Sequence, residues 1–255
     1  MSEPVQFPDP APALPRSRCM APAASRPFAV SDVGRVAAII PALNEADRIG
    51  AVLGALLPHV STALVVDDGS ADGTAAAARG AGAEVIRHPA RRGKGAAMRT
   101  GITALLGRGH AFLLFLDGDG QHDPDDAPAL IRAARERGYD LVIGHRTLHR
   151  GLSGPVRYYT NLVGCNMLSR WTGLDLRDSQ SGYRLVRSAH LKEITLESRG
   201  FEIETEMLLK LCRRGSRVGQ VEVRSVPPSR RSHLRPVRDV TRICLTAVRY
   251  HFQPM

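Results

Sequence analysis

Short, mostly apolar runs recur through the middle of the chain, separated by longer stretches in which apolar residues follow helical spacing. Short runs bounded by polar residues or glycine are typical of strands buried within a sheet. They predict strands at Val36–Ile40, Ala63–Val66, Glu84–Ile86, Ala111–Leu116 and Asp140–Ile143.

Helices are expected between these strands, at Ala46–Leu57, Thr74–Arg79, Ala96–Leu106 and Pro124–Arg137. The last of them carries one apolar stripe, formed by Ala127, Leu130, Ile131 and Ala134. Alternation of strands and helices is the pattern of βαβ units. The chain is therefore predicted to form a single α/β domain, with a mostly parallel, Rossmann-like central sheet flanked by helices.

The pattern changes after residue 150. Two further helices, at Val156–Trp171 and Ile203–Arg213, flank a glycine-rich loop. A strand over Val218–Val226 then leads to a basic terminal helix over Arg235–Phe252. The many prolines near the start, without apolar periodicity, predict a disordered Pro- and Ala-rich tail. We therefore expect a tail over residues 1–33, a globular domain over residues 34–234 and the terminal helix over residues 235–255.

The composition suits one ordinary globular domain, because 43% of the 255 residues are hydrophobic. The tail lacks the apolar core of a signal peptide, and no segment has the ~18 apolar residues that a membrane span needs. The four cysteines show no paired spacing, which argues against a zinc site or a disulfide framework. We expect a soluble or peripheral protein of a reducing cytoplasm.

The net charge of +10 and the isoelectric point near 10.2 suit nucleic acid, an anionic membrane or phosphorylated substrates. Aromatic residues make up only 5% of the chain and no nucleic-acid recognition motif is present, so we exclude nucleic acid as a partner. Arginines crowd the last third of the chain, whereas the acidic pairs lie mainly between residues 67 and 126. This split predicts an anion-binding side and a metal-binding side.

Two aspartates, Asp117 and Asp119, follow the most apolar run of the chain on either side of Gly118. Open α/β sheets bind their ligands at the carboxyl ends of strands, where both carboxylates would emerge. Carboxylates this close repel each other unless a cation lies between them, and Mg²⁺ or Mn²⁺ prefers such oxygen ligands. The alternative is a polar turn, since Asp123-Pro124 is a good start for the following helix.

The other strand ends add polar loops to the same edge of the sheet. The first strand leads to Pro41-Ala42-Leu43-Asn44-Glu45, and the second leads to Asp67-Asp68. These two aspartates can accept hydrogen bonds from a nucleobase or a ribose. Ser70 and Asp72, which follow them, are expected to start the next helix.

A basic, glycine-containing stretch, Arg92-Gly93-Lys94-Gly95, stands just before the third predicted helix. A cation and two glycines beside a helix N-terminus predict a phosphate site. The stretch is not a Walker loop, because no glycine stands five residues before Lys94 and no serine or threonine follows it.

Taken together, these loops resemble the family 2 glycosyltransferases with the GT-A fold, and more closely their polyprenyl-phosphate (dolichol-phosphate) mannose synthase branch. The resemblance covers about residues 36–245. It rests on the loops above and on three later motifs, which are Gly144-His145-Arg146, Asp178-Ser179-Gln180-Ser181-Gly182-Tyr183-Arg184 and Gly200-Phe201-Glu202-Ile203-Glu204-Thr205-Glu206. Each motif is short, but their order and spacing are specific.

The resemblance implies roles for individual residues. The nucleotide would be bound by Pro41, Leu43, Glu45, Asp67, Asp68, Lys94, Asp117 and Gly118. An Mg²⁺ or Mn²⁺ ion would be held against the diphosphate by Asp117, Asp119 and Gln121. Catalysis would rest on Asp119 and on two arginines facing the acceptor phosphate, Arg146 and Arg157. Arg230 or Arg231 would close over the donor, although His233 stands where the family often has a lysine.

The implied activity is metal-dependent, inverting transfer of a hexose from a nucleotide sugar, GDP-mannose or UDP-glucose, to a polyprenyl phosphate. A phosphate monoester has its second pKa near ~6, so the acceptor is mostly dianionic at neutral pH and needs no strong general base. Two alternatives stay open: a family member acting on a non-lipid acceptor, and a sugar nucleotidyltransferase. The second is disfavoured because the glycine-rich loop that such enzymes carry after the first strand is absent.

The terminal helix combines an apolar stripe with arginines on its other sides. The stripe contains Val237, Val240, Ile243, Cys244, Ala247 and Val248, with His251 or Tyr250. Such a helix can pack on the domain or lie on an anionic membrane surface. A lipid substrate favours the membrane, so we expect a cytoplasmic protein that is peripheral at the inner face of the membrane. A membrane-embedded partner subunit stays open.

Overall fold

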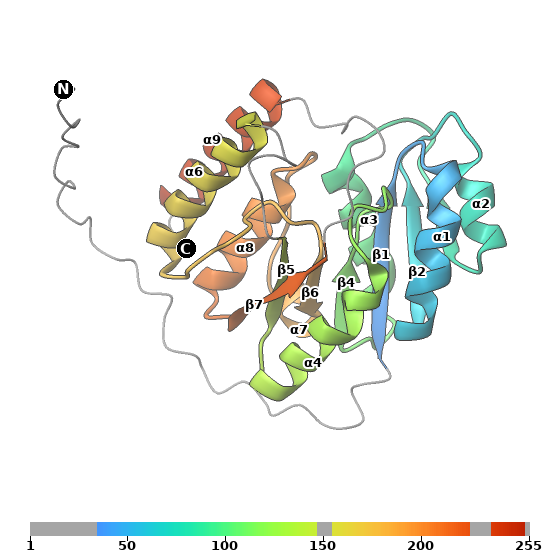
Figure 1. Ribbon diagram of the computed structural model, residues 1–255, viewed down its shortest axis with the longest axis horizontal. Helices are drawn as coiled ribbons and strands as arrows, with labels where there is room; N and C mark the ends of the chain where they lie inside the picture. The colour runs from blue at the N-terminus through green and yellow to red at the C-terminus, as the bar shows by residue number, and fades with distance from the viewer. Residues whose placement is uncertain (1–34, 147–154, 225–235, 253–255) are drawn as a thin grey trace, which may run out of the picture.

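Seven strands in the described parts of the chain pair into one sheet, in the order β3-β2-β1-β4-β6-β5-β7 (Figure 1). The computed structural model describes residues 35–146, 155–224 and 236–252, with the backbone alone at 155–160, 236–240 and 251–252. The strands are β1 (Val36–Ala42), β2 (Thr62–Asp67), β3 (Glu84–Arg87), β4 (Phe112–Phe115), β5 (Leu141–Arg146), β6 (Arg184–Arg187) and β7 (Val218–Val223). The helices are α1 (Ala46–Leu56), α2 (Thr74–Gly80), α3 (Lys94–Leu105), α4 (Ala127–Arg137), α6 (Pro155–Thr172), α7 (Ser188–Lys192), α8 (Ile203–Arg213) and α9 (Pro236–Phe252), with short 3₁₀ turns η2 (Leu57–His59) and η3 (Pro124–Asp126).

The first four strands follow the predicted apolar runs closely. β1 and β4 are buried at every position, which is why their sequences are apolar throughout. β1 pairs in parallel with β2 and β4, and β2 pairs in parallel with β3. These strands therefore direct their carboxyl ends to one edge, and the predicted mostly parallel α/β sheet is confirmed.

The glycine-rich loop expected between the later helices contains an unpredicted strand. β6 pairs antiparallel with both β4 and β5, and the short helix α7 follows it. Its sequence has an arginine at each end, Arg184 and Arg187, so it does not read as an apolar run. The sequence pattern did not predict this strand because Arg184 is fully buried, and its guanidinium is satisfied by hydrogen bonds within the protein rather than by solvent.

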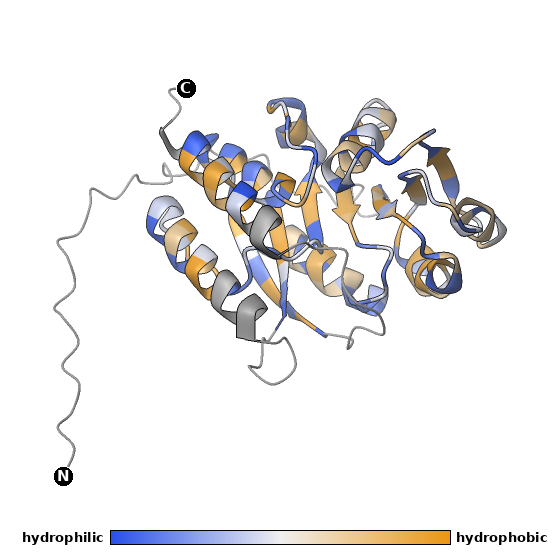
Figure 2. Ribbon diagram, turned by 90° about the horizontal axis from the view of Figure 1, so that it is seen from above, coloured by the Kyte–Doolittle hydropathy of each residue, from blue (hydrophilic) through white to orange (hydrophobic). Residues whose placement is uncertain are grey.

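Helices cover both faces of the sheet. α1, α2 and α4 pack on one face, and α3, α6, α8 and α9 pack on the other. Alternate residues of β1 show this division, because Ala38 and Ile40 join the first layer whereas Ala37 and Ile39 join the second. Figure 2 shows the apolar positions gathered on the strands and on the helix faces turned toward them.

The terminal helix α9 packs on α8 and α6 through part of its predicted stripe. Ile243, Ala247 and Tyr250 are buried, whereas Val248 is 44% exposed and Leu245 is 63% exposed. α9 therefore belongs to the folded core and also carries an exposed apolar edge. No helix in the described parts of the chain is long and apolar enough to cross a membrane. The predicted tail over residues 1–33 lies outside the described residues.

Candidate active site

The loops that follow β1, β2 and β4 meet at the carboxyl edge of these strands. Ala42, the last residue of β1, lies opposite Asp67, the last residue of β2. The loop after β4 stays beside β1, because the Gly118 amide donates to the Pro41 carbonyl over 3.4 Å. The predicted convergence of the three loops is thus a consequence of strand register.

The loops after β1 and β2 are hydrogen-bonded to each other. Asn44 has a φ of 57°, in the left-handed region that asparagine tolerates better than most residues. Its amide donates to Ser70 Oγ at 2.9 Å, and its side-chain oxygen accepts from the Ala71 amide at 2.8 Å. Asp72 accepts from the Thr74 amide at 3.0 Å at the start of α2. Asp72 thus stands at the start of α2 as predicted, whereas Ser70 joins the two loops and does not start the helix.

A pocket opens where these loops meet. It is lined by Pro41, Ala42, Leu43, Glu45, Asp68, Arg91, Lys94, Ala97, Asp117, Gly118, Asp119 and Phe201. All the described residues predicted to bind nucleotide are in this lining, except Asp67. The sequence assigned no role to Arg91, Ala97 or Phe201, although Arg91 adjoins one quoted motif and Phe201 lies within another.

Asp67 lies beneath the pocket rather than in its wall. Its side chain is fully buried, with Oδ1 accepting from the Ser70 amide at 2.9 Å and Oδ2 at 3.3 Å from Arg87 Nε. These contacts shape the loop after β2. A direct bond from Asp67 to a nucleobase or ribose stays a prediction.

Asp68 organises the loop that precedes α3. Its oxygens accept from His88 Nδ1 at 2.7 Å, from the Arg92 amide at 2.9 Å and from the Gly93 amide at 2.7 Å. This carboxylate therefore holds the neighbouring strand end and the residues before Lys94 in place. Its side chain still reaches the pocket wall.

The N-terminus of α3 does not offer the predicted backbone phosphate site. The Gly95 and Ala96 amides both donate to the Arg199 carbonyl, at 2.9 and 3.3 Å. A Cβ at Gly95 would lie 2.5 Å from the Ser198 carbonyl oxygen, so glycine is needed for the close approach of that segment. The prediction is wrong for these amides because a distant loop already occupies them. The Lys94 side chain remains available to the pocket.

A buried ionic cluster connects the pocket to α8. Lys94 Nζ lies 2.7 Å from one oxygen of Asp117 and 2.9 Å from the other, and 2.6 Å from Glu204 Oε1. Burial would lower the pKa of Lys94, but the two carboxylates outweigh it and raise that pKa. Burial would raise the pKa of Asp117, but Lys94 outweighs it and lowers that pKa. Both groups are therefore charged at neutral pH.

Asp119 stands beside this cluster and has the chemistry of a metal ligand. Burial, with the negative charge of Asp117, raises its pKa, so a second cation is favoured here. The backbone amide of Gln121 donates to Asp119 Oδ1 at 3.0 Å, and its side-chain Nε2 donates to Asp119 Oδ2 at 2.5 Å. Among the described residues no group of three or more His, Cys, Asp or Glu side chains is placed to hold a metal. Two carboxylates with further oxygens from a diphosphate and water are nevertheless a usual arrangement for Mg²⁺.

Arg146, at the end of β5, is aimed at the site by a buried partner. Its Nε donates to Asp178 Oδ2 at 2.9 Å, and the Asp178 carboxylate is fully buried. The positive charge of Arg146 is close enough to act on the pKa of both Asp117 and Asp119, and it favours their ionised forms. The structure thus brings Arg146 close to Asp117 and Asp119, the two carboxylates predicted to bind a metal ion. The side chain of Arg157, and all of Arg230 and Arg231, lie outside the described residues.

Arg184 is the hub of a buried hydrogen-bond network. This fully buried guanidinium donates to the carbonyl oxygens of Ser179 and Ser181, each at 2.8 Å, and to that of Glu204. It therefore ties the loop after α6 to the start of α8. The sequence showed Asp178, Arg184 and Glu204 within motifs but gave them no role, because their partners lie far away in the chain.

His122 is buried close to Asp117, and its Nδ1 has no hydrogen-bond partner among the described residues. Its ring centroid lies 5.3 Å from that of Tyr183. Burial, with the positive charge of Arg146, lowers its pKa to about 4. The imidazole is therefore neutral at physiological pH and adds no charge to the site.

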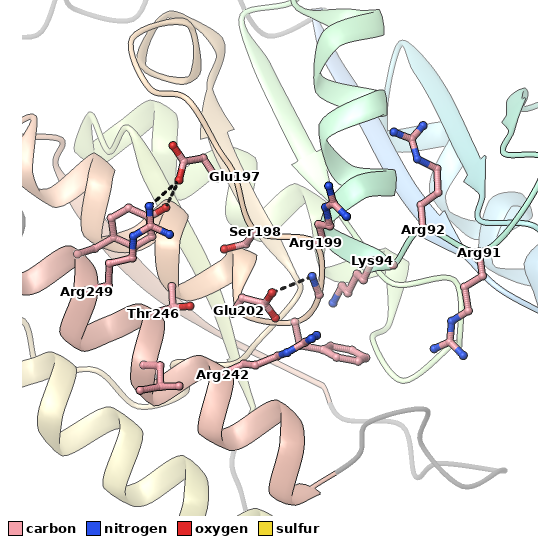
Figure 3. A pocket seen from close by; sticks show the side chains of 15 residues that line it. Arg91, Arg92, Lys94, Glu197, Ser198, Arg199, Glu202, Arg242, Thr246 and Arg249 are labelled. Atoms are coloured by element: carbon pink, nitrogen blue, oxygen red, sulfur yellow. Dashed lines mark hydrogen bonds and ion pairs between the residues drawn. The ribbon is translucent and has the colours of Figure 1, made fainter.

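A basic groove of about 990 Å³ adjoins the pocket (Figure 3). It runs from the N-terminal end of α3 past residues 197–202 to α9. Arg91, Arg92, Lys94, Arg199 and Arg242 line it. Arg91, Lys94 and Phe201 line the pocket as well, so the two cavities share a wall.

With this geometry established, the comparison with known proteins is decisive for the family. The model of "Glycosyl transferase family 2" matches residues 37–195, which span all three loops and the Asp178 motif. The chain is a family 2 glycosyltransferase. The suspected resemblance is confirmed at this level, and the protein is a glycosyltransferase enzyme.

Several relatives of this glycosyltransferase have informative names. An undecaprenyl-phosphate mannosyltransferase of Micrococcus luteus is 35% identical over 202 residues, covering 74% of this chain and 82% of the relative. A polyprenol monophosphomannose synthase of Mycolicibacterium smegmatis is 31% identical over 212 residues, covering 77% of this chain and 79% of the relative. Among solved structures, a glucosyl-3-phosphoglycerate synthase from Mycobacterium tuberculosis has a TM-score of 0.69 at 20% identity, covering 92% of this chain and 88% of that one. This last likeness confirms the GT-A fold.

Proposed function

We propose that this glycosyltransferase transfers a hexose from a nucleotide sugar to a polyprenyl phosphate. The observation that carries the proposal is the pocket at the strand ends, where Asp117 and Asp119 stand beside Arg146. Supporting it are relatives at 35% and 31% identity whose names specify a mannosyl transfer to undecaprenyl phosphate and the synthesis of polyprenol monophosphomannose. The proposed donors are GDP-mannose and UDP-glucose.

The pocket provides the donor site in this proposal. Pro41, Leu43 and Glu45 would contact the nucleoside, and Asp117, Asp119 and Gln121 would hold Mg²⁺ or Mn²⁺. When bound, the ion would neutralise the diphosphate and so stabilise the leaving nucleoside diphosphate. The M. tuberculosis synthase was solved with Mn²⁺ and UDP, which supports the choice of metal.

The acceptor phosphate is the nucleophile. One of its oxygens forms a bond to the anomeric carbon as the bond from that carbon to the diphosphate breaks, which inverts the configuration. The dianionic phosphate needs no general base, so neutral His122 accepts no proton in this step. The role of Arg146 and Arg157 is to bring the lipid phosphate next to a second anion. Arg230 or Arg231 would cover the donor.

We further propose that the protein works at the cytoplasmic face of a membrane. The exposed large hydrophobic residues of the described chain are Leu162, Val163, Leu245 and Val248, and all lie on the adjacent helices α6 and α9. Exposed Arg242 and Arg249 lie on α9 as well. Apolar side chains flanked by arginines suit the interface of an anionic bilayer.

The proposal is tested with purified protein and a panel of substrates. GDP-mannose and UDP-glucose are each combined with a short polyprenyl phosphate or with 3-phosphoglycerate, in Mg²⁺, Mn²⁺ or EDTA, and lipid-linked sugar and released nucleotide are both measured. We expect glycosylated polyprenyl phosphate with one donor, only when metal is present. Product formed on 3-phosphoglycerate alone would point instead to a soluble acceptor.

A further inference from the structure

The cluster at the back of the pocket has a feature that the transfer reaction does not explain. Lys94 Nζ contacts both oxygens of Asp117, at 2.7 and 2.9 Å. Asp117 is one of the two carboxylates that fit a divalent ion. Both Asp117 oxygens are thus already in contact with an ammonium group.

We propose that Lys94 is a positioning residue. In the nucleotide-free enzyme its ammonium group occupies the position beside Asp117 that a metal ion would take, and it moves away from Asp117 when a diphosphate binds. One positive charge then balances Asp117 until the substrate supplies an anion for Lys94. Metal binding and nucleotide binding become mutually dependent, since each ligand changes the affinity for the other by the same factor. The inference rests on the proposed metal site.

The surroundings of Lys94 favour this exchange. Glu204 Oε1 lies 2.6 Å from Nζ and provides a second anchor, so the ammonium can loosen its contact with Asp117 without becoming an unpaired buried charge. Nζ also lies 5.3 Å from the centre of the Phe201 ring. Lys94 and Phe201 line both the pocket and the basic groove, so the side chain has open space on its far side (Figure 3).

The residue types agree with this assignment. Of the 35 basic residues only three are lysines, Lys94, Lys192 and Lys210, so arginine is the default cation of this chain. A lysine provides a compact point charge on a flexible stem, whereas a guanidinium would form a fixed, planar fork on the carboxylate. Gly182 leaves the space for the pair, because a Cβ there would lie 2.6 Å from Asp117 Oδ2 and 3.0 Å from Lys94 Nζ.

The scarcity of lysine permits a direct test on the intact wild-type protein. With ¹⁵N-lysine labelling, three ammonium groups can be followed by NMR during titration with Mg²⁺, GDP or UDP, and both together. We expect the Lys94 signal to change most when metal and nucleotide are both present. The Lys192 signal, from an exposed side chain, should not move. A Lys94 signal unchanged in a protein that binds both ligands would overturn the inference and leave the proposed function standing.

A second measurement is the affinity for Mn²⁺ without nucleotide, read from the electron paramagnetic resonance of free Mn²⁺. Removing a cation next to Asp117 should strengthen Mn²⁺ binding by about tenfold or more. Because Lys94→Met alone leaves Glu204 buried and unpaired, the comparison is Glu204→Gln against Glu204→Gln with Lys94→Met, and Lys192→Met is the control. A merely structural Lys94 predicts the opposite, weaker binding. Failure of wild type to bind Mn²⁺ even with GDP or UDP would overturn both this inference and the metal site.

Discussion

The proposed donor side and the proposed acceptor side of this site are built in different ways. On the donor side, the loops after β1, β2 and β4 arrive in chain order at one edge and are joined by local hydrogen bonds such as those of Asn44. On the proposed acceptor side, Arg146 is held by a buried ionic contact with Asp178, and Arg184 is held by buried hydrogen bonds to three carbonyl groups. The difference implies that Asp119, whose hydrogen bonds stay within its own loop, can be removed without loss of the fold, whereas the buried Arg184 cannot.

The largest effect is expected on the donor side. Asp119→Ala should lower kcat by about a thousandfold or more, because charge stabilisation of the leaving diphosphate would be lost. Turnover and thermal melting are measured together, with Asp125→Ala, an exposed aspartate, as the control. Unchanged melting with lost turnover is the expected pattern. Substantial activity in Asp119→Ala, or in wild type with EDTA, would contradict the metal assignment.

The opposite pattern is expected for the acceptor-side hub. Arg184→Met leaves three buried carbonyl groups without their donor and should lower the free energy of unfolding by about 3 to 5 kcal/mol. Urea denaturation measures this loss. Arg224→Met, which removes an exposed arginine paired with Asp123 and Asp126 at the surface, should lower stability far less. An Arg184→Met protein that is inactive but as stable as wild type would reverse the comparison.

His122 should make the free energy of unfolding depend on pH. The folded protein keeps it neutral down to about pH 4, whereas the unfolded chain takes up the proton near pH 6.5. The unfolded state therefore binds more protons than the folded state between pH 4 and pH 6.5. The contribution of neutral His122 to the free energy of unfolding is complete above pH 6.5 and is lost as the pH falls to about 4. The loss due to His122 should approach about 3 kcal/mol. In urea titrations at a series of pH values, His122→Gln should show a shallower decline, and an identical decline would exclude the buried neutral form.

Arg157 tests whether the acceptor side also binds the lipid phosphate. Arg157→Ala should raise the KM for polyprenyl phosphate, or lower kcat, by about ten- to a hundredfold, because a charge-assisted contact would be lost. The KM for the nucleotide sugar should change much less. Steady-state kinetics with each substrate varied in turn provides the measurement. Equal effects on both substrates would place Arg157 outside the acceptor site.

The smallest effect is expected at the surface of α9. Arg242→Glu should weaken binding to anionic liposomes by several-fold at low salt, since each basic residue near such a surface contributes about 1 kcal/mol. Leu245→Asn should weaken it further. Substitutions are preferable to truncation here, because Ile243, Ala247 and Tyr250 belong to the core. Arg135→Glu on α4, exposed in the other helical layer, is the matched control. If these changes in α9 leave co-sedimentation with liposomes unaffected, the exposed apolar edge of α9 binds a partner other than the membrane.

Much of the donor side could be predicted from the sequence because its information is local. The strands β1, β2 and β4 are buried, mostly apolar runs, and the polar residues that follow them must emerge at the carboxyl edge. Asp117, Asp119 and Pro41 were therefore placed correctly at one pocket. The order of the motifs was also sufficient to indicate the family.

Only the tertiary structure decided how charges are compensated. Lys94 pairs with Glu204 across more than a hundred residues of chain, and Arg184 is buried in a strand whose sequence resembles an exposed segment. Gly95 was expected to expose the N-terminus of α3 to phosphate, but the Arg199 carbonyl occupies its amide. Such pairings depend on which distant groups lose water together, and burial rather than residue type determines that. Hydrophobic periodicity records which faces are buried, but it does not record which buried charge meets which partner.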